Sequence, residues 1–168
     1  MLRSIIIAEL ERETKIIQHL IKEMPAETLN YKPAENMRTT KELLDYLVVC
    51  TLGVFVDNYC NQDQEKAKEE KAKIYKELEG VEDKDYVAAM EWQLNKVKYY
   101  LSQISDEDLA KPYKLFWGEE RALGHALLLS PVKYLTAYKQ QLFLYIKMNG
   151  KADINTYDCW LGIKKPVS

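Results

Sequence analysis

The sequence has few of the residues from which metal sites and covalent active sites are usually built. Its 168 residues include 2 histidines and 3 cysteines. The cysteines, Cys50, Cys60 and Cys159, form no C-x-x-C pair and leave an odd thiol over, so neither a disulfide framework nor a structural zinc site is indicated. Unpaired thiols fit a reducing compartment, and we expect a cytoplasmic protein.

Long hydrophobic runs and an excess of one charge are also missing. The start, MLRSIIIAELERETK, has one short apolar run before charges resume, and no stretch approaches the ~20 apolar residues that span a bilayer. Lysine and arginine number 24 against 26 acidic residues, a formal net charge of −2. We therefore expect a soluble protein that binds neither membranes nor nucleic acid.

Motifs for other kinds of catalysis are absent as well. The sequence has no glycine-rich phosphate loop and no pair of carboxylates at a distinctive spacing. Cys50 has no histidine near it in sequence to activate the thiol, and Ser130 precedes a proline in an ordinary capping context. No catalytic residue is therefore assigned from the sequence.

The sequence is rich in helical periodicity, and its length fits one domain, 1–168. Apolar residues that recur with charged residues between them predict a first helix over about 2–23. Thr39 stands three residues before Glu42 in a capping box, which predicts a second helix that continues to around Asn61.

The middle of the chain contains a charged segment and then a third core helix. In DQEKAKEEKAKIYKELEG, lysines and glutamates alternate at helical spacing, which is typical of a solvated helix in a long connection that ends at Gly80. The segment DKDYVAAMEWQLNKVKYYLSQI then places apolar residues in helical register. After it, YKLFW predicts a short extended piece before a turn at Gly118.

The last long helix carries an aromatic and aliphatic stripe and contains Pro131. Either the helix kinks at Pro131, or Ser130 caps a new helix; we predict the kink. The C-terminal tail is irregular in pattern, and Trp160 with Leu161 is predicted to anchor it against the bundle. Together these elements predict an all-α four-helix bundle with one long helical crossover.

Two segments resemble the signature regions of the DinB/YfiT-like superfamily of metal-dependent enzymes: MPAETLNYKPAENMRTTKELLDYL and KYLTAYKQQLFLYIKMNG. In that family a turn proline and a Ser or Thr cap lead to Glu-Leu-Leu and then a histidine. The last helix carries H-x-x-x-H-R-G-Q, a hydrophobic run and a glycine. The resemblance covers most of the chain and implies a DinB-like four-helix bundle.

The matching positions of this sequence keep the frame and replace the metal ligands. The proline is Pro33, the cap is Thr39, and Glu42 begins the Glu-Leu-Leu triplet. Gln141 is the one residue kept from Arg-Gly-Gln, and Gly150 closes the helix. Tyrosines occupy the three histidine places: Tyr46, Tyr134 and Tyr138.

The tyrosines alter the chemistry that the resemblance implies. A neutral imidazole offers a lone pair to a divalent metal at pH 7, whereas a phenol with a pKa near ~10 is mostly protonated. Three interpretations stay open: an aromatic core, a small-molecule pocket, or a metal site. The candidate ligand pocket comprises Tyr46, Tyr134, Tyr138, Glu42, Cys50 and Gln141. No metal and no cofactor is expected.

The two histidines do not restore the triad. His19 lies between inward-facing positions of the first helix and is turned away from them, and His125 is turned to roughly the opposite side from Tyr134. Glu42 and Cys50, at i−4 and i+4 from Tyr46, share its helix face and offer an oxygen and a sulfur, although both also fit structural roles.

Two functional classes follow. One is a DinB-like protein with a degenerate metal site that is non-catalytic or binds a small molecule in a tyrosine-lined cavity. The other, implied by the resemblance, is a metal-dependent hydrolase or a transferase that acts with a low-molecular-weight thiol. We also expect a homodimer, formed through the aromatic surface around Trp92, Tyr99 and Tyr100.

Overall fold

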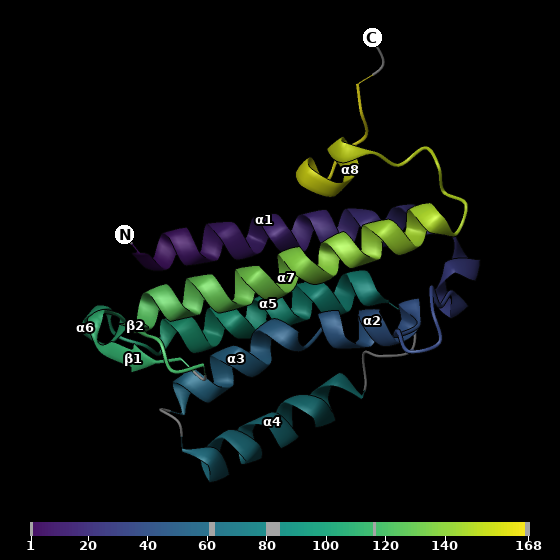
Figure 1. Cartoon of the computed structure of the whole chain (residues 1–168). Coiled ribbons are helices and arrows are strands. Elements are labelled where there is room, and N and C mark those ends of the chain that lie inside the picture. The colour runs from purple at the N-terminus through teal and green to yellow at the C-terminus, as the bar shows by residue number, and fades with distance from the viewer. Residues whose placement is uncertain (1, 61–62, 80–84, 116, 167–168) are drawn as a thin grey trace.

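A computed structural model describes residues 2–60, 63–79, 85–115 and 117–166 (Figure 1). The described chain is mostly helical, as the sequence predicts. The long helices are α1 (Leu2–Glu23), α2 (Thr40–Leu47), α3 (Cys50–Tyr59), α4 (Gln64–Leu78), α5 (Tyr86–Ser102) and α7 (Leu123–Met148). The short elements are the 3-10 helix η1 (Ala26–Asn30), α6 (Asp106–Ala110), strands β1 (Pro112–Lys114) and β2 (Glu120–Ala122), and α8 (Thr156–Leu161).

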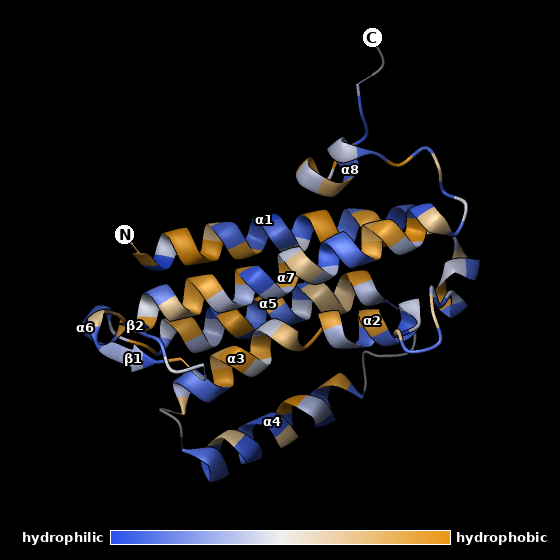
Figure 2. Ribbon diagram, viewed as in Figure 1, coloured by the Kyte–Doolittle hydropathy of each residue, from blue (hydrophilic) through white to orange (hydrophobic). Residues whose placement is uncertain are grey.

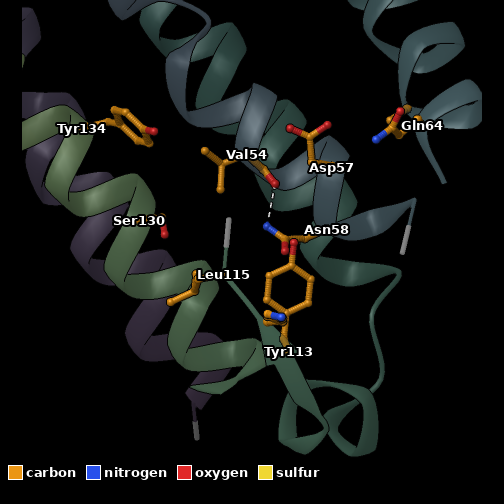
Figure 3. A pocket seen from close by; sticks show the side chains of 10 residues that line it. Val54, Asp57, Asn58, Gln64, Tyr113, Leu115, Ser130 and Tyr134 are labelled. Carbon is orange, nitrogen blue, oxygen red and sulfur yellow. Dashed lines mark hydrogen bonds between the residues drawn. The ribbon is translucent and has the colours of Figure 1, made fainter. Parts of the chain in front are cut away.

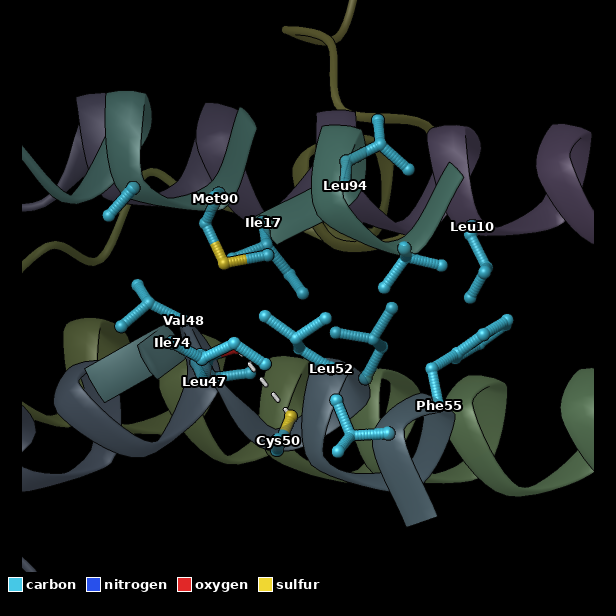
Figure 4. Packing of buried hydrophobic residues seen from close by; sticks show 14 of the residues in the cluster. Leu10, Ile17, Leu47, Val48, Cys50, Leu52, Phe55, Ile74, Met90 and Leu94 are labelled. Carbon is cyan, nitrogen blue, oxygen red and sulfur yellow. Dashed lines mark hydrogen bonds between the residues drawn. The ribbon is translucent and has the colours of Figure 1, made fainter. Parts of the chain in front are cut away.

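Four helical rods form the core: α1, α3, α5 and α7. α1 packs against α5 and α7, and α3 packs against the same two helices from the other side. Leucines and isoleucines from all four rods fill the space between them, with Leu10, Ile17, Leu52, Phe55 and Met90 at the centre (Figure 4). The burial of these apolar stripes drives the four-helix arrangement.

The charged segment forms α4, which lies outside the four rods and packs on α3 (Figure 1). Figure 2 shows hydrophilic residues along much of this helix. Three side chains of α4 itself are buried: Ala67, Ile74 and Leu78. The Tyr100 hydroxyl donates to Oε2 of Glu70 on α4 at 3.0 Å. The predicted solvated connection is thus a helix with one attached face. Its predicted end at Gly80 lies outside the described residues.

The first helix spans Leu2–Glu23, as the sequence predicts, and the second begins with the predicted capping box. The Thr39 side chain accepts from the Glu42 backbone N–H, and Glu42 accepts from the Thr39 backbone N–H at 2.7 Å. The prediction of one helix from here to around Asn61 is wrong, and Asn61 itself lies outside the described residues. The helix stops at Leu47, and α3 starts at Cys50.

The segment between α5 and α7 contains the predicted extended piece. β1 and β2 pair antiparallel, with Tyr113 opposite Arg121. Gly118 has a φ of 92°, a left-handed conformation that glycine adopts without strain. α7 then runs from Leu123 through Pro131, so the alternative in which Ser130 caps a new helix is wrong. The kink at Pro131 stays a prediction.

The tail is attached differently from the prediction. Trp160 and Leu161 are 65% and 52% exposed, so they do not anchor it. Asp158 and Cys159 are buried instead, and Oδ1 of Asp158 lies 2.8 Å from Nε2 of His19 on α1. His19 is thus turned away from the core, as predicted, and its side chain contacts Asp158 of the tail. Trp160 and Leu161 face solvent, because Asp158 and Cys159 are the side chains of α8 that are buried.

The aromatic surface predicted for a homodimer is smaller than the sequence suggests. Tyr99 is exposed and Trp92 is half-buried, but Tyr100 is buried beneath α4 and is no part of that surface. The homodimer stays a prediction. Among the described helices, none combines the length and the apolar character needed to cross a membrane.

Candidate functional site

The three predicted tyrosines meet between α2 and α7. The ring centroids of Tyr46 and Tyr138 lie 4.9 Å apart in an edge-to-face arrangement with an interplanar angle of 69°. Tyr134 lies one turn earlier on α7, and its ring is parallel to that of Tyr138 at 6.5 Å. The i,i+4 spacing on α7 places two phenols on one face, and the packing of α2 against α7 brings the third to them.

A cation covers this tyrosine cluster. The guanidinium carbon of Arg38 lies 4.7 Å from the centroid of the Tyr46 ring and 5.8 Å from that of Tyr138. Both distances are within the range of a cation–π interaction, which is worth roughly 0.5–1 kcal/mol at an exposed site. Arg38 precedes the Thr39 cap, so the turn that starts α2 also carries the charge onto the two rings.

Hydrogen bonds from α7 hold that turn in place. The Tyr145 hydroxyl donates to the carbonyl of Arg38 at 3.2 Å and accepts from Nε2 of Gln141 at 2.6 Å. Tyr31 packs edge-to-face on Tyr145 at 5.8 Å, and its carbonyl accepts the Thr40 backbone N–H at 2.9 Å. Gln141 therefore supports this turn through Tyr145.

Burial keeps the Tyr46 phenol and the Cys50 thiol neutral. Removal from water is the largest of the effects that raise the pKa of Tyr46 to about 12, and the nearby Cys50, Tyr138 and Tyr134 act in the same direction. Burial likewise raises the pKa of the Cys50 thiol to about 12, against hydrogen bonds with Thr51. At pH 7 both groups are protonated, so neither is an activated nucleophile.

The six predicted pocket residues do not all come together. Tyr46, Tyr134 and Tyr138 form the cluster. Cys50 is buried at the start of α3, where its Sγ donates to the Leu47 carbonyl at 3.5 Å. The carboxylate of Glu42 is exposed and used by the Thr39 cap, and Gln141 is bonded to Tyr145. Glu42, Cys50 and Gln141 thus have structural partners of their own.

The residues at the metal positions of the DinB/YfiT-like pattern do not fit a divalent metal. The donors are phenols, the pKa of Tyr46 is raised, and the guanidinium of Arg38 lies over two of the rings. A cation next to protonated oxygens repels a second cation rather than attracting it. Within the described ranges, no group of three or more His, Cys, Asp or Glu side chains is arranged to hold a metal ion.

The break between α2 and α3 is bridged by an amide from α5. Gln93 is 2% exposed, and its Oε1 accepts the backbone N–H groups of Thr51 at 3.1 Å and Leu52 at 3.3 Å. Its Nε2 donates to the Leu47 carbonyl at 3.0 Å. One side chain thereby satisfies the end of α2 and the start of α3, which a helix break would otherwise leave unpaired.

Beside the tyrosine cluster lies a cleft of about 560 Å³ between α3, α4, the β1 strand and α7 (Figure 3). Its volume is in the range of small-molecule sites. The residues that line it are Val54, Asp57, Asn58, Gln64, Ala67, Tyr113, Lys114, Leu115, Ser130 and Tyr134. Tyr134 belongs to both features, since its ring is parallel to that of Tyr138 and its hydroxyl points toward Val54 on α3.

Asn58 on the cleft wall carries an acceptor that nothing in the described chain satisfies. The residue is 8% exposed, and its Nδ2 donates to the Val54 carbonyl at 2.6 Å. Its Oδ1 is buried without a hydrogen-bond partner among the described residues. A buried polar atom of this kind costs about 1–3 kcal/mol.

Comparison with known proteins agrees with this architecture. No protein-family model matches the sequence, and no curated protein matches it. Solved structures do: a DinB-like protein from Bacillus subtilis aligns over 90% of this chain and 96% of its own, with a TM-score of 0.65 and 18% sequence identity. The chain has the DinB-like fold. At that identity the similarity establishes the arrangement of the helices in this DinB-like bundle and leaves its chemistry to its own residues.

Several residues of the site were not found from the sequence. Arg38 stands in a polar turn, Gln93 in the middle of a helix, and Asn58 near the end of one. A buried amide on an otherwise apolar helix face is a usable signal, and Gln93 between Met90 and Leu94 shows it. For Arg38 the sequence offers no such signal, because its partners lie on α2 and α7.

Proposed function

We propose that this protein binds a small molecule and does not catalyse a reaction with a metal. The ligand site is the cleft beside the tyrosine cluster, and the metal site that the resemblance to DinB/YfiT-like enzymes implies is degenerate. In this proposal the three tyrosines and Arg38 form a packed wall of the cleft. Tyr134 is the part of that wall that a ligand in the cleft contacts.

The position of Tyr134 carries the proposal. Its ring is parallel to that of Tyr138 in the cluster, while the residue also lines the cleft of about 560 Å³. The cleft combines apolar surface from Val54 and Leu115 with polar groups such as Ser130, which is typical of sites for small organic molecules. These features support binding without requiring a metal or a nucleophile.

The alternative, a metal-dependent hydrolase or a thiol transferase, finds less support in the same residues. Its chemistry needs donors that are deprotonated at neutral pH, whereas burial raises the pKa of Tyr46 to about 12. The Arg38 guanidinium adds a positive charge where a metal would need a negative one.

A metal titration separates the two functions. Wild-type protein should contain no stoichiometric transition metal by elemental analysis, and titration with Ni²⁺ or Zn²⁺ should show no binding at one equivalent. The triple variant Tyr46→His, Tyr134→His, Tyr138→His should gain a site, since two imidazoles one turn apart are a zinc-binding arrangement.

Arg38 supplies a sharper control for that titration. Adding Arg38→Ala to the triple variant should raise the metal affinity by about 10-fold, because it removes a cation a few ångströms from the new site. The same change in wild type should create no site. A native metal at one equivalent, or equal binding by wild type and the triple variant, would favour the metal-dependent enzyme.

A further inference from the structure

We infer that Arg38 binds the carboxylate of a small organic acid, at a site that its guanidinium forms together with the rings of Tyr46 and Tyr138. The rings hold the guanidinium in place, and the guanidinium donates hydrogen bonds to the carboxylate. This site goes beyond the proposed function, because Arg38 is not among the residues that line the cleft. The two sites are therefore tested separately.

The guanidinium of Arg38 lies in a corner between two aromatic rings. Its carbon is 4.7 Å from the centroid of Tyr46 and 5.8 Å from that of Tyr138, and the two rings are inclined to each other by 69°. These contacts use the positive charge over the ring faces and leave hydrogen-bond donors at the edge of the guanidinium. Its five N–H groups form a planar fork whose spacing matches the two oxygens of a carboxylate.

Within the described chain, the N–H donors of Arg38 have no acceptor. Other arginines of the protein are paired: Arg3 with Asp106 at 3.1 Å, and Arg121 with Glu119. The Arg38 side chain is exposed, so a dissolved molecule reaches its donors without any movement of the protein. An arginine with ring contacts, free donors and access to solvent is suited to bind an anion.

The backbone around Arg38 is fixed on both sides. The Tyr145 hydroxyl donates to the Arg38 carbonyl at 3.2 Å, and the next residue, Thr39, is the cap of α2 and is bonded to Glu42. The two rings restrain the side chain at its other end. A side chain restrained in this way loses less conformational entropy on binding than a mobile surface arginine does.

The charges near Arg38 favour a single negative charge on the ligand. The Glu42 carboxylate accepts the backbone N–H and the hydroxyl of Thr39, at 2.7 Å and 3.0 Å, and is therefore committed to the cap. These hydrogen bonds lower the pKa of Glu42, and the charges of Lys32 and Arg38 act in the same direction. Two cations and one carboxylate thus share this region, which leaves one positive charge. A carboxylate balances it, whereas a phosphate dianion exceeds it.

A pair of probes of nearly the same shape tests the inference. Benzoate and benzamide differ in charge, and each is titrated at millimolar concentration and pH 7 into isotope-labelled protein. The backbone amide signals and the arginine Nε–H signals report affinity and location. For wild type we expect benzoate to bind about 5-fold or more tightly than benzamide, with shifts at Arg38. Added sodium chloride should weaken the binding of benzoate and leave that of benzamide unchanged.

Variants assign the preference to one arginine. Arg38→Met and Arg38→Gln remove the charge and keep an unbranched side chain, so benzoate and benzamide should bind each of them within about twofold of each other. Arg12→Met is the matched control, because Arg12 is an exposed arginine on α1, and this variant should keep the wild-type preference. Circular dichroism shows which variants are folded, and either folded Arg38 variant is sufficient.

The inference is overturned if wild type binds the two probes equally, or if a folded Arg38 variant keeps the preference. A loss in Arg12→Met as large as in Arg38→Met would show only general attraction of anions to the surface and would also overturn it. Inorganic phosphate is the third probe, and tighter binding of phosphate than of benzoate at Arg38 would overturn the assignment to a carboxylate. Shifts at the residues that line the cleft test the proposed function and are independent of these outcomes.

Discussion

Two buried amides of this protein, Gln93 and Asn58, have opposite hydrogen-bonding states. Gln93 lies at the break between α2 and α3, and both ends of its amide form hydrogen bonds with backbone groups there. Asn58 lies near the end of α3, on the cleft wall, and within the described chain only its nitrogen has a hydrogen-bond partner. The two side chains have the same functional group and similar burial, yet the number of partners differs.

The difference lies in what each amide does for stability. A fully paired buried amide connects elements, because each bond replaces one that the backbone lost at the helix break. A half-paired buried amide destabilises the fold, because its acceptor has lost water without gaining a partner. Burial and residue type alone do not distinguish the two amides; their partners do.

The largest expected effect comes from removing the paired amide. Gln93→Leu would leave the N–H groups of Thr51 and Leu52 and the carbonyl of Leu47 buried without this partner. We expect the free energy of unfolding to fall by about 3 kcal/mol or more, since each such group costs about 1–3 kcal/mol. Urea unfolding followed by circular dichroism measures it.

An exposed amide on the same helix is the control for that change. Asn95→Leu should alter the free energy of unfolding by less than about 0.5 kcal/mol, as most surface substitutions do. A loss for Gln93→Leu no greater than that of Asn95→Leu would show that the bridge across the helix break contributes nothing, and the contrast with Asn58 would disappear.

The next largest effect on stability comes from the ionisation of the Cys50 thiol, at the start of α3. Burial raises the pKa of its thiol from about 9 to about 12. The folded state thus holds this proton more tightly, and the contribution to stability is complete below pH 9 and is lost as pH rises to 12. At pH 11 the loss amounts to about 2–3 kcal/mol from this group alone.

Unfolding measured between pH 8 and 11 in wild type and in Cys50→Ala tests this window. The variant should lose less stability than wild type as pH rises, although it starts lower because a buried side chain is truncated. Parallel curves for the two proteins would mean that the thiol does not titrate in this range. Tyr46, whose pKa is raised to about 12, contributes in the same direction above pH 10.

The smallest expected effect is on the unpaired amide. Asn58→Leu removes a buried acceptor without a partner, and the Val54 carbonyl keeps its place in the helix. The free energy of unfolding should therefore stay within about 1 kcal/mol of wild type or rise, measured beside Gln93→Leu under the same conditions. A loss as large as that of Gln93→Leu would mean that Asn58 stabilises the fold as strongly as Gln93 does, and the contrast between the two amides would disappear.

The sequence predicts the local elements well. The bounds of α1, the capping box of Thr39 and Glu42 and the extended piece before Gly118 follow from spacing and from residues a few positions apart. Tyr46 and Tyr138 were also placed together in the candidate pocket, and their rings pack against each other because the faces of neighbouring helices meet. The prediction that Trp160 anchors the tail was wrong, because hydrophobicity alone does not reveal which side of a short helix is attached.

The amino-acid sequence by itself determined the helical periodicity, the position of the caps and the placement of Tyr134 and Tyr138 on one helix face. These depend on neighbours within about one or two turns of the chain. Only the tertiary structure decided that the second helix breaks at Leu47, that Arg38 covers the tyrosine rings, and that Oδ1 of Asn58 is buried without a partner among the described residues. The physical reason is that each of these depends on groups from distant segments, whose hydrogen bonds and charges meet only once the helices have packed.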